Sequence, residues 1–441
     1  MTGSPALSAL RQTADFGALG REMHALIAEL YPLCRSITGE GLRQTLRRIR
    51  HDVPLTIHEV PSGTTVLDWT VPREWNIRDA YVADARGERV IDFRKSNLHV
   101  VNYSVPVHAR MPLHELRPRL HSLPGRPEWI PYRTSYYAED WGFCLAHRDL
   151  ERLRDETYEV VIDSTLEDGS LSYGEVFLPG ATSEEVLLSC HVCHPSLAND
   201  NLSGLALVAT LARLLGSVER RYSYRFLFVP GTIGSITWLA RNEAATERIR
   251  HGLTAACVGD AGALTYKKSR RGNAEIDRAA QHVLVASGRP HAIVEFAPYG
   301  YDERQYNSPG FNLAVGSLTR TPNGRYPEYH TSADNLDFVR PDSLGDSLRT
   351  YLDVLAALEG NGRYRNTHPR GEPQLGKRGL YGAIGGFPDP GELPMAMLWV
   401  LNLSDGGPTL LEIADRAGLP FDRVRAAADL LAAHGLLDPA P

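Results

Sequence analysis

Residues 186–204, VLLSCHVCHPSLANDNLSG, bring together side chains that bind metals and carry protons. Residues 190–194 form a C-x-x-C-H pattern, which attaches c-type haem, and Cys190 with Cys193 could also form a redox pair. The same stretch offers imidazole and carboxylate groups, which are common zinc ligands. Because the motif follows a buried-type strand instead of opening a helix, and no distal axial ligand is evident, we favour a metal site over both alternatives.

The predicted elements place further ligand-type residues at the same edge of a sheet. Residues 186–191 read as a strand and 202–215 as a helix, so His191 ends a strand and Asp200 lies near a helix start. Asp260 follows the apolar run AACVG, and His330 lies in EYHTSADN. Ligands of α/β sheets bind at the carboxyl ends of the strands. Two His and two Asp at such ends predict a hydrolytic zinc site, in which a bridging carboxylate holds two ions about 3.5–4 Å apart.

Strands and helices alternate along the central part of the chain. The runs YEVVIDSTL, EEVLLSC, YRFLFVP and TAACVGDAG are strand-like, and helical periodicity lies between them and after TSADNLDFV. This order predicts an α/β sheet covered on both faces, in residues 1–65 and 149–365. Residues 66–148, rich in Trp, Tyr, Pro and Asn, predict an inserted β-rich module. Residues 363–375 resemble a linker, and residues 373–441 a winged helix.

Charge and composition restrict the class of partner. The 441 residues carry a net charge of −6, and residues 373–441 hold 5 Lys+Arg against 8 Asp+Glu. A DNA-binding module normally shows the opposite charge, so we expect a structural or protein-contact role for the winged helix and no nucleic-acid or membrane partner. Five cysteines, the lack of a signal-peptide pattern and the lack of an 18-residue apolar run predict a cytoplasmic location. A homo-oligomer stays open.

Several motifs resemble those of a known superfamily. VLLSCH…ANDNLSG, CVGD and YHTSADN resemble the zinc-dependent aminopeptidases, which have a phosphorylase/hydrolase-like α/β fold and are kin to glutaminyl cyclases. Nearly the whole chain, including DWTVPREWNIRDAY, HPSLANDNLSG and DERQYNSPGFNLAVGSL, resembles bacterial aminopeptidase-like proteins of the polysaccharide-biosynthesis type. The resemblance implies a mixed-sheet core with an inserted β-rich domain and a C-terminal winged helix.

The resemblance also implies roles for individual residues. Asp200 corresponds to the metal-bridging carboxylate, Asp260 to its partner ligand at the first metal, and His330 to a ligand of the second metal. The first-metal histidine is either His191, which we slightly favour, or His194. The cysteine between these two histidines stays open as a further ligand. One or two Zn²⁺ ions are implied.

Position 231 departs from the pattern of the superfamily. A general-base glutamate is expected in a P-E-T-I-G-S motif, whereas residues 230–235 read PGTIGS, with Gly231 in its place. An introduced inactivating substitution, divergence to other chemistry or to binding alone, and replacement by Asp302 or Glu303 as base all fit this difference. Asp302 also corresponds to a polar residue of the substrate pocket. Loss of a general base costs about 10²–10⁴-fold in rate.

These observations predict a zinc-dependent aminopeptidase-like amidohydrolase that acts on a small peptide or aminoacylated metabolite, in a biosynthetic pathway. The alternative is a catalytically impaired protein that binds a metal or ligand and serves as a scaffold, which Gly231 favours.

Overall fold

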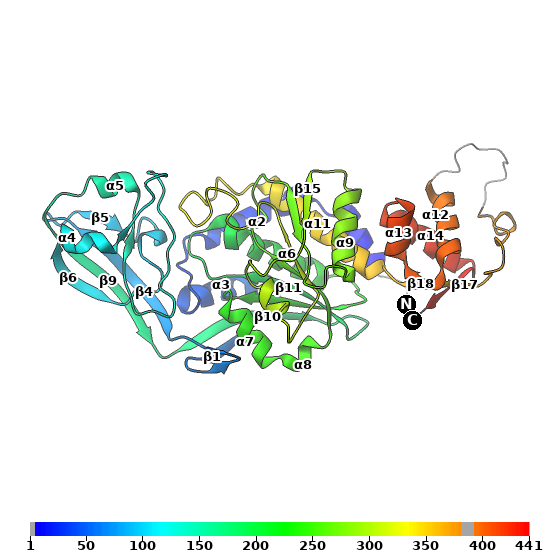
Figure 1. Ribbon diagram of the computed structural model, residues 1–441, viewed down its shortest axis with the longest axis horizontal. Helices are drawn as coiled ribbons and strands as arrows, with labels where there is room; N and C mark the ends of the chain where they lie inside the picture. Colours follow the sequence, from blue (N-terminus) through cyan, green and yellow to red (C-terminus); the bar gives the residue numbers. More distant parts are fainter. Residues whose placement is uncertain (1–4, 381–391, 441) are drawn as a thin grey trace.

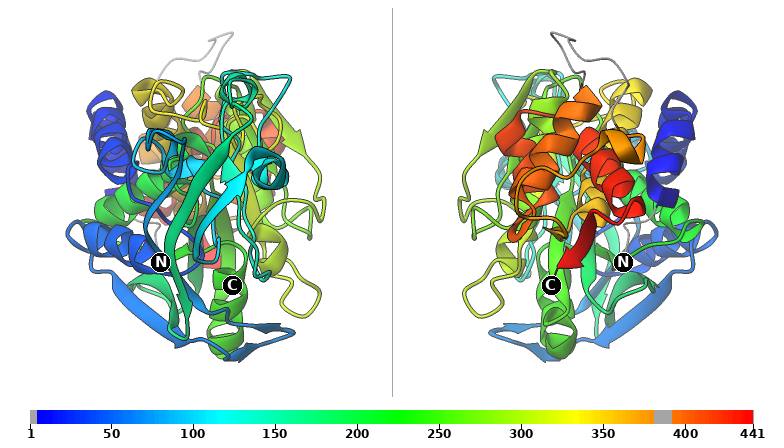
Figure 2. Two further views of the ribbon diagram at one scale, coloured as in Figure 1. Left: turned by 90° about the vertical axis from the view of Figure 1, so that its left-hand side faces the viewer. Right: turned by 90° about the vertical axis from the view of Figure 1, so that its right-hand side faces the viewer.

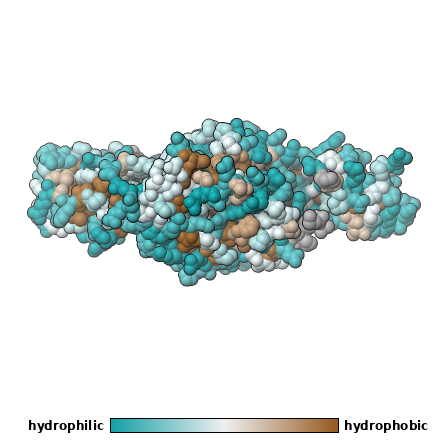
Figure 3. All heavy atoms as spheres, turned by 90° about the horizontal axis from the view of Figure 1, so that it is seen from below, coloured by the Kyte–Doolittle hydropathy of each residue, from teal (hydrophilic) through white to brown (hydrophobic). Residues whose placement is uncertain are grey.

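The computed structural model describes residues 5–380 and 392–440, which form three bodies in a row (Figure 1). A β-rich body lies at one end, an α/β body in the middle and a helical body at the other end. The two views along the long axis show the strands of the first body and the helices of the last one nearest the viewer (Figure 2). Seen from below, the mostly hydrophilic surface carries small apolar patches, several of them on the wide central body (Figure 3).

An eight-stranded mixed sheet forms the middle body. Its order is β1-β10-β12-β11-β13-β16-β14-β15. The inner strands β12, β11, β13 and β16 are mutually parallel, whereas β1, β10 and β14 each pair antiparallel with a neighbour. The strands are β1 (Thr56–Pro61), β10 (Ser170–Leu178), β11 (Glu185–His191), β12 (Ser223–Val229), β13 (Ile249–Ala255), β14 (Leu264–Lys267), β15 (His291–Val294) and β16 (Val315–Thr319).

Helices cover both faces of this sheet, as the sequence predicts. Every residue of β11 and β12 is buried, which is typical of strands with helices on both sides. Their side chains alternate between two apolar clusters: Leu188 packs with α2, α6 and α11, whereas Leu187 packs with α7. The helices of this body are α1 (Pro5–Thr13), α2 (Phe16–Leu30), α3 (Glu40–Arg50), α6 (Gly204–Gly216), α7 (Ile233–Arg241), α8 (Glu243–Thr246), α9 (Glu275–Ala286), α10 (Glu303–Tyr306) and α11 (Pro341–Gly360).

The β-rich body is built on a four-stranded antiparallel sheet of order β5-β4-β9-β6. Its strands are β4 (Glu74–Ala83), β5 (Arg89–Asp92), β6 (Val107–Pro112) and β9 (Thr157–Glu167). Smaller elements connect or flank them: β2 (Thr65–Val66), β3 (Trp69–Thr70), α4 (Leu113–Leu116), β7 (Leu120–His121), β8 (Phe143–Cys144) and α5 (His147–Glu151).

Strand β9 differs from the sequence prediction, which assigned YEVVIDSTL to the α/β sheet and ended the insert at residue 148. Residues 157–167 pair with β4 and β6 instead. The reason lies in burial: in β9 buried residues such as Tyr158 and Val160 alternate with partly exposed ones, so only one face packs on a core. The inserted sheet therefore extends to residue 167.

The C-terminal body is a winged helix, as the sequence predicts. Helices α12 (Glu392–Leu403), α13 (Leu410–Ala417) and α14 (Phe421–Ala433) pack beside a sheet of β17 (Arg363–Asn366), β18 (Asp405–Thr409) and β19 (Leu437–Ala440). Residues 363–366, which the sequence assigned to a linker, thus form the central strand of this sheet. Its apolar residues continue the α2–α6–α11 cluster, so the module is docked on the α/β body. None of the helices in the described ranges is long and apolar enough to span a bilayer.

Candidate metal centre

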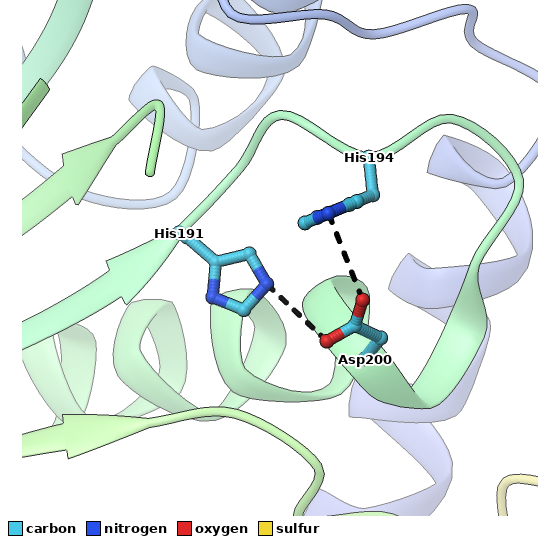
Figure 4. Close-up of side chains that lie close together, drawn as sticks. All are labelled: His191, His194 and Asp200. Atoms are coloured by element: carbon cyan, nitrogen blue, oxygen red, sulfur yellow. Dashed lines mark ion pairs between the residues drawn. The ribbon is translucent and has the colours of Figure 1, made fainter. Parts of the chain in front are cut away.

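The carboxyl end of β11 and the start of α6 position three ligand-type side chains. Strand β11 ends at His191, a loop carries His194, and a π-helical turn, Ala198–Ser203, carries Asp200 into α6. Gly204 lets this helix approach β13, because a Cβ there would lie 2.2 Å from the carbonyl oxygen of Ala255. The turn therefore packs closely on the edge of the sheet, where Asp200 faces the imidazoles of His191 and His194 (Figure 4).

One ligand atom from each of His191, His194 and Asp200 lies within 4.8 Å of the others, close enough for a single ion. The Nε2 atom of His191 is 3.5 Å from Asp200 Oδ1, and the Nε2 atom of His194 is 3.8 Å from Asp200 Oδ2. His330, which comes from a distant part of the chain, places its Nε2 atom 3.0 Å from Asp200 Oδ2. The structure therefore gathers both candidate first-metal histidines around one carboxylate, together with His330.

Burial and nearby charges keep these side chains in the protonation states that bind a cation. His191, His194 and Asp200 are all buried, and the Nε2 atom of His191 has no hydrogen-bond partner. Burial holds the pKa of His194 well below its usual value, so its imidazole is neutral with a free lone pair. Burial alone would raise the pKa of Asp200, but the surrounding imidazoles hold it well below its usual range. A neutral imidazole and an ionised carboxylate are the forms that ligate metals.

The backbone around Asp200 is fixed by another carboxylate, Asp334 of the TSADN stretch. It accepts hydrogen bonds from the backbone N–H groups of Asn199 (2.6 Å) and Asp200 (3.0 Å). Burial, together with the charge of Asp200, raises the pKa of Asp334 to about 7. Sequence reasoning noted the motif that contains Asp334 but gave this residue no role. It supports the turn that carries Asp200.

The inserted domain reaches this centre through residues 130–136. The Tyr132 backbone N–H donates to the carbonyl of His330 (2.8 Å), and its ring lies edge-on to the rings of His194 and His330, each 5.1 Å away. Its hydroxyl meets that of Tyr136 at 2.9 Å. Tyr132, which was not singled out, is the side chain that covers the imidazoles.

Asp260 is not one of the three residues whose ligand atoms gather, so its role as a partner ligand stays a prediction. Its two oxygens accept hydrogen bonds from the Asn199 side chain (3.0 Å), the backbone of Gly262 (2.7 Å), and the hydroxyl and backbone of Thr321 (2.6 and 3.2 Å). The Sγ atom of Cys257 lies 3.9 Å from Asp200 Oδ1. The backbone turns at Cys257 (φ 50°), shortly after β13 ends at Ala255.

Asp302 and Glu303, the two candidates for the general base, line one pocket. Gly231 contacts Tyr301, which lines the same pocket. Asp302 and Glu303 line the pocket with His191 and Asp200. Asp302 accepts a hydrogen bond from the Ser235 hydroxyl (2.8 Å), and burial raises its pKa to about 6. Glu303 is engaged by the Lys267 ammonium and by the backbone N–H of Tyr301. Gly231 offers only its backbone carbonyl there.

These residues fit a zinc ion. Two imidazole nitrogens and one carboxylate oxygen are a typical donor set for a zinc site that leaves a coordination position open. The Nε2 atom of His191 supports this fit, because it is buried without a hydrogen-bond partner, 3.5 Å from Asp200 Oδ1, and such an atom destabilises the folded protein unless something binds it. The His191, His194 and Asp200 group could therefore hold a metal ion.

The fold is that of the zinc aminopeptidases. A zinc aminopeptidase from Bacillus subtilis superposes with a TM-score of 0.55 at 11% identity, covering 76% of this chain and 94% of that one. A Clostridium acetobutylicum crystal structure, provisionally called a peptidase, superposes with a TM-score of 0.92 at 52% identity, covering 97% of this chain and 98% of that one. The fold class and the family resemblance expected from the sequence are thus confirmed.

The family follows from direct sequence similarity. Residues 24–361 match a domain of unknown function, DUF4910, and residues 362–439 match a winged helix-turn-helix. A Clostridium acetobutylicum protein, provisionally assigned to polysaccharide biosynthesis and carrying an aminopeptidase-like domain, is 55% identical over 412 residues, 93% of this chain and 95% of the relative. The chain belongs to the DUF4910 family.

Proposed function

We propose that the chain is a zinc-dependent amidohydrolase that cleaves a small peptide or an aminoacylated metabolite in the cytoplasm. The observation that supports this most is the buried His191, His194 and Asp200 group with its unpartnered imidazole nitrogen. When bound, zinc polarises a carbonyl and lowers the pKa of water to about 7. The provisional assignment of the Clostridium relative to polysaccharide biosynthesis supports a biosynthetic pathway.

Asp302 is the residue that we assign to proton transfer. Its carboxylate lines the pocket beside His191, and its pKa of about 6 lets it accept a proton at neutral pH. The hydrogen bond from Ser235 fixes the orientation of the carboxylate. The ring of Tyr132 packs edge-on against the rings of His194 and His330 and places apolar surface beside the centre, which strengthens electrostatic interactions there. A covered centre of this kind favours small substrates over protein chains and offers no surface for a nucleic acid.

The test is hydrolysis by metal-free protein that has been reloaded with one equivalent of Zn²⁺. Aminoacyl p-nitroanilides and dipeptides serve as substrates, and Asp200→Asn is compared with Asp337→Asn, a change at an exposed carboxylate, as the control. We expect turnover with the zinc-loaded wild type and a loss of at least 10²-fold for Asp200→Asn. Turnover that survives both a chelator and Asp200→Asn would refute the proposal.

A second candidate, a metal- or ligand-binding scaffold without catalysis, is favoured by Gly231. Its signature is stoichiometric zinc bound at the same three residues with no turnover of any amide substrate.

A further inference from the structure

The space beside Gly231 is filled by a side chain from a distant part of the sequence. A Cβ added at Gly231 would lie 2.0 Å from Cε1, 2.7 Å from Cδ1 and 2.8 Å from Cζ of Tyr301. All three contacts are with one edge of an aromatic ring, and the shortest is far below any real Cβ contact. No residue other than glycine can stand at position 231 while Tyr301 keeps its place.

Tyr301 is held in this place from several sides. Its backbone N–H donates to Glu303 Oε2 (3.0 Å), and Glu303 is in turn bound by Lys267. Its hydroxyl donates to the carbonyl of Gly231 (3.2 Å) and lies 3.5 Å from the Sγ atom of Cys193. The backbone is thus fixed, and the ring cannot swing away without breaking the contacts of its hydroxyl.

The ring of Tyr301 also packs on the metal centre. Its centroid lies 4.3 Å from that of the His191 ring, with the two planes at 57°, and 5.8 Å from that of the His194 ring. The Nε2 atom of His191 has no hydrogen-bond partner and lies 3.5 Å from Asp200 Oδ1, so polar contact at that atom holds the ring only weakly. The face of Tyr301 is a packing contact that fixes the orientation of this imidazole.

We propose that Gly231 and Tyr301 are a matched pair. Tyr301 is a positioning residue that orients His191 toward Asp200, and Gly231, which has no side chain, leaves the space that the Tyr301 ring occupies. The metal centre then requires glycine at position 231, and this residue is not an inactivating substitution. A glutamate placed at position 231 has no room, so Gly231→Glu alone displaces Tyr301 and restores nothing. The inference rests on the metal site of the proposed function but does not require hydrolysis.

A double-mutant cycle in the full-length protein tests the steric match without any metal. The variants are Gly231→Ala, Tyr301→Ala and the pair combined, and the readout is the midpoint of urea unfolding of metal-free protein. Gly231→Ala should lower the midpoint in the wild-type background and leave it unchanged in the Tyr301→Ala background. Gly216→Ala is the matched control, because a Cβ at Gly216 meets nothing within 4 Å. Equal effects of Gly231→Ala in both backgrounds would overturn the match.

Zinc affinity tests the positioning role, measured by competition with a chromophoric chelator. Supporting residues around a metal ligand change metal affinity about 10–100-fold. We expect Gly231→Ala and Tyr301→Ala each to weaken Zn²⁺ binding by about 10-fold or more, and the combined variant to match Tyr301→Ala. Tyr301→Phe, which keeps the ring, should restore both the affinity and the visible spectrum of the Co²⁺-substituted protein.

The outcomes separate this inference from the proposed function. Wild-type affinity in Tyr301→Ala, with an unchanged Co²⁺ spectrum, would overturn the positioning role whether or not the protein hydrolyses amides. Zinc binding with the expected coupling but no turnover would support the pair and refute the hydrolase. Failure of the wild type to bind zinc would refute both.

Discussion

Replacing His191 with alanine should abolish the stabilisation of the protein by zinc. His191 supplies the only atom of the three-residue group that is buried without a hydrogen-bond partner, so an ion bound there gains most from this imidazole. Its Nε2 atom lies 3.5 Å from Asp200 Oδ1, a long contact whose loss costs the metal-free protein little. The variant should therefore fold without metal and lose the response to zinc.

The size of the zinc response in the wild type can be worked out. A ligand at 1,000 times its dissociation constant stabilises the folded state by about 4.1 kcal/mol. Unfolding of roughly 340 residues, the extent of the matched domain, carries an entropy of about 0.7 kcal/mol/K at about 2.1 cal/mol/K per residue. The melting temperature should therefore rise by about 6 °C with zinc in the wild type, and by less than about 1 °C in His191→Ala.

Differential scanning fluorimetry of metal-free protein, with and without buffered Zn²⁺, measures this difference. His251→Ala is the matched control, because His251 is equally buried but contacts Tyr222, away from the centre. The control should lower the melting temperature in the absence of metal and keep the full zinc response. A His191→Ala variant that retains more than half of the wild-type response would refute the assignment of this residue as a ligand.

Three further results are expected. Glu185 is fully buried and bound by two arginines, so Glu185→Ala should lower the free energy of unfolding in urea by about 3–5 kcal/mol. Glu184 forms an exposed ion pair, so Glu184→Ala should lower it by less than about 1 kcal/mol. Equal losses in the two variants would contradict the burial argument. Asp302 has a pKa raised to about 6 and must be ionised to accept a proton, so kcat/KM should fall as the pH drops below about 6, and Asp302→Asn should lose activity at every pH; an unchanged pH profile in that variant would exclude Asp302 as the base. His282 contacts Asp415 (2.7 Å) and accepts a hydrogen bond from the first N–H of α14 (3.0 Å). His282→Ala should lower the free energy of unfolding by about 1–3 kcal/mol and speed amide hydrogen exchange in α14 but not in α6. Equal changes of exchange in both helices would show that His282 does not dock the winged helix.

Local pattern was sufficient to predict the middle of the sheet and the core of the site. The run that ends at His191 is mostly apolar and is followed by helical periodicity, so a strand end and a helix start were expected to meet near Asp200. The winged helix followed from the same kind of periodicity. Strand β9 was misassigned because an alternating strand can belong to any half-buried sheet, and only its pairing partners, β4 and β6, show which one.

The parts of the site that the sequence did not reveal depend on contacts between distant segments. Cys257 approaches Asp200 because the backbone turns at a left-handed residue, which the letters CVGD do not show. Tyr132 reaches His194 only because the insert folds over the sheet edge. The ring of Tyr301, seventy positions further along the chain, fills the space beside Gly231. The sequence alone shows only that a glutamate is missing at position 231 and not that a tyrosine occupies its space.

The central claim is that His191, His194 and Asp200 bind one metal ion. An anomalous difference map of zinc-loaded crystals, collected above and below the zinc absorption edge, tests it most directly. We expect one peak within about 2.0–2.2 Å of a nitrogen of each histidine and an oxygen of Asp200. A fully zinc-loaded protein with its peak elsewhere, or with these three side chains unchanged and without metal between them, would contradict the claim.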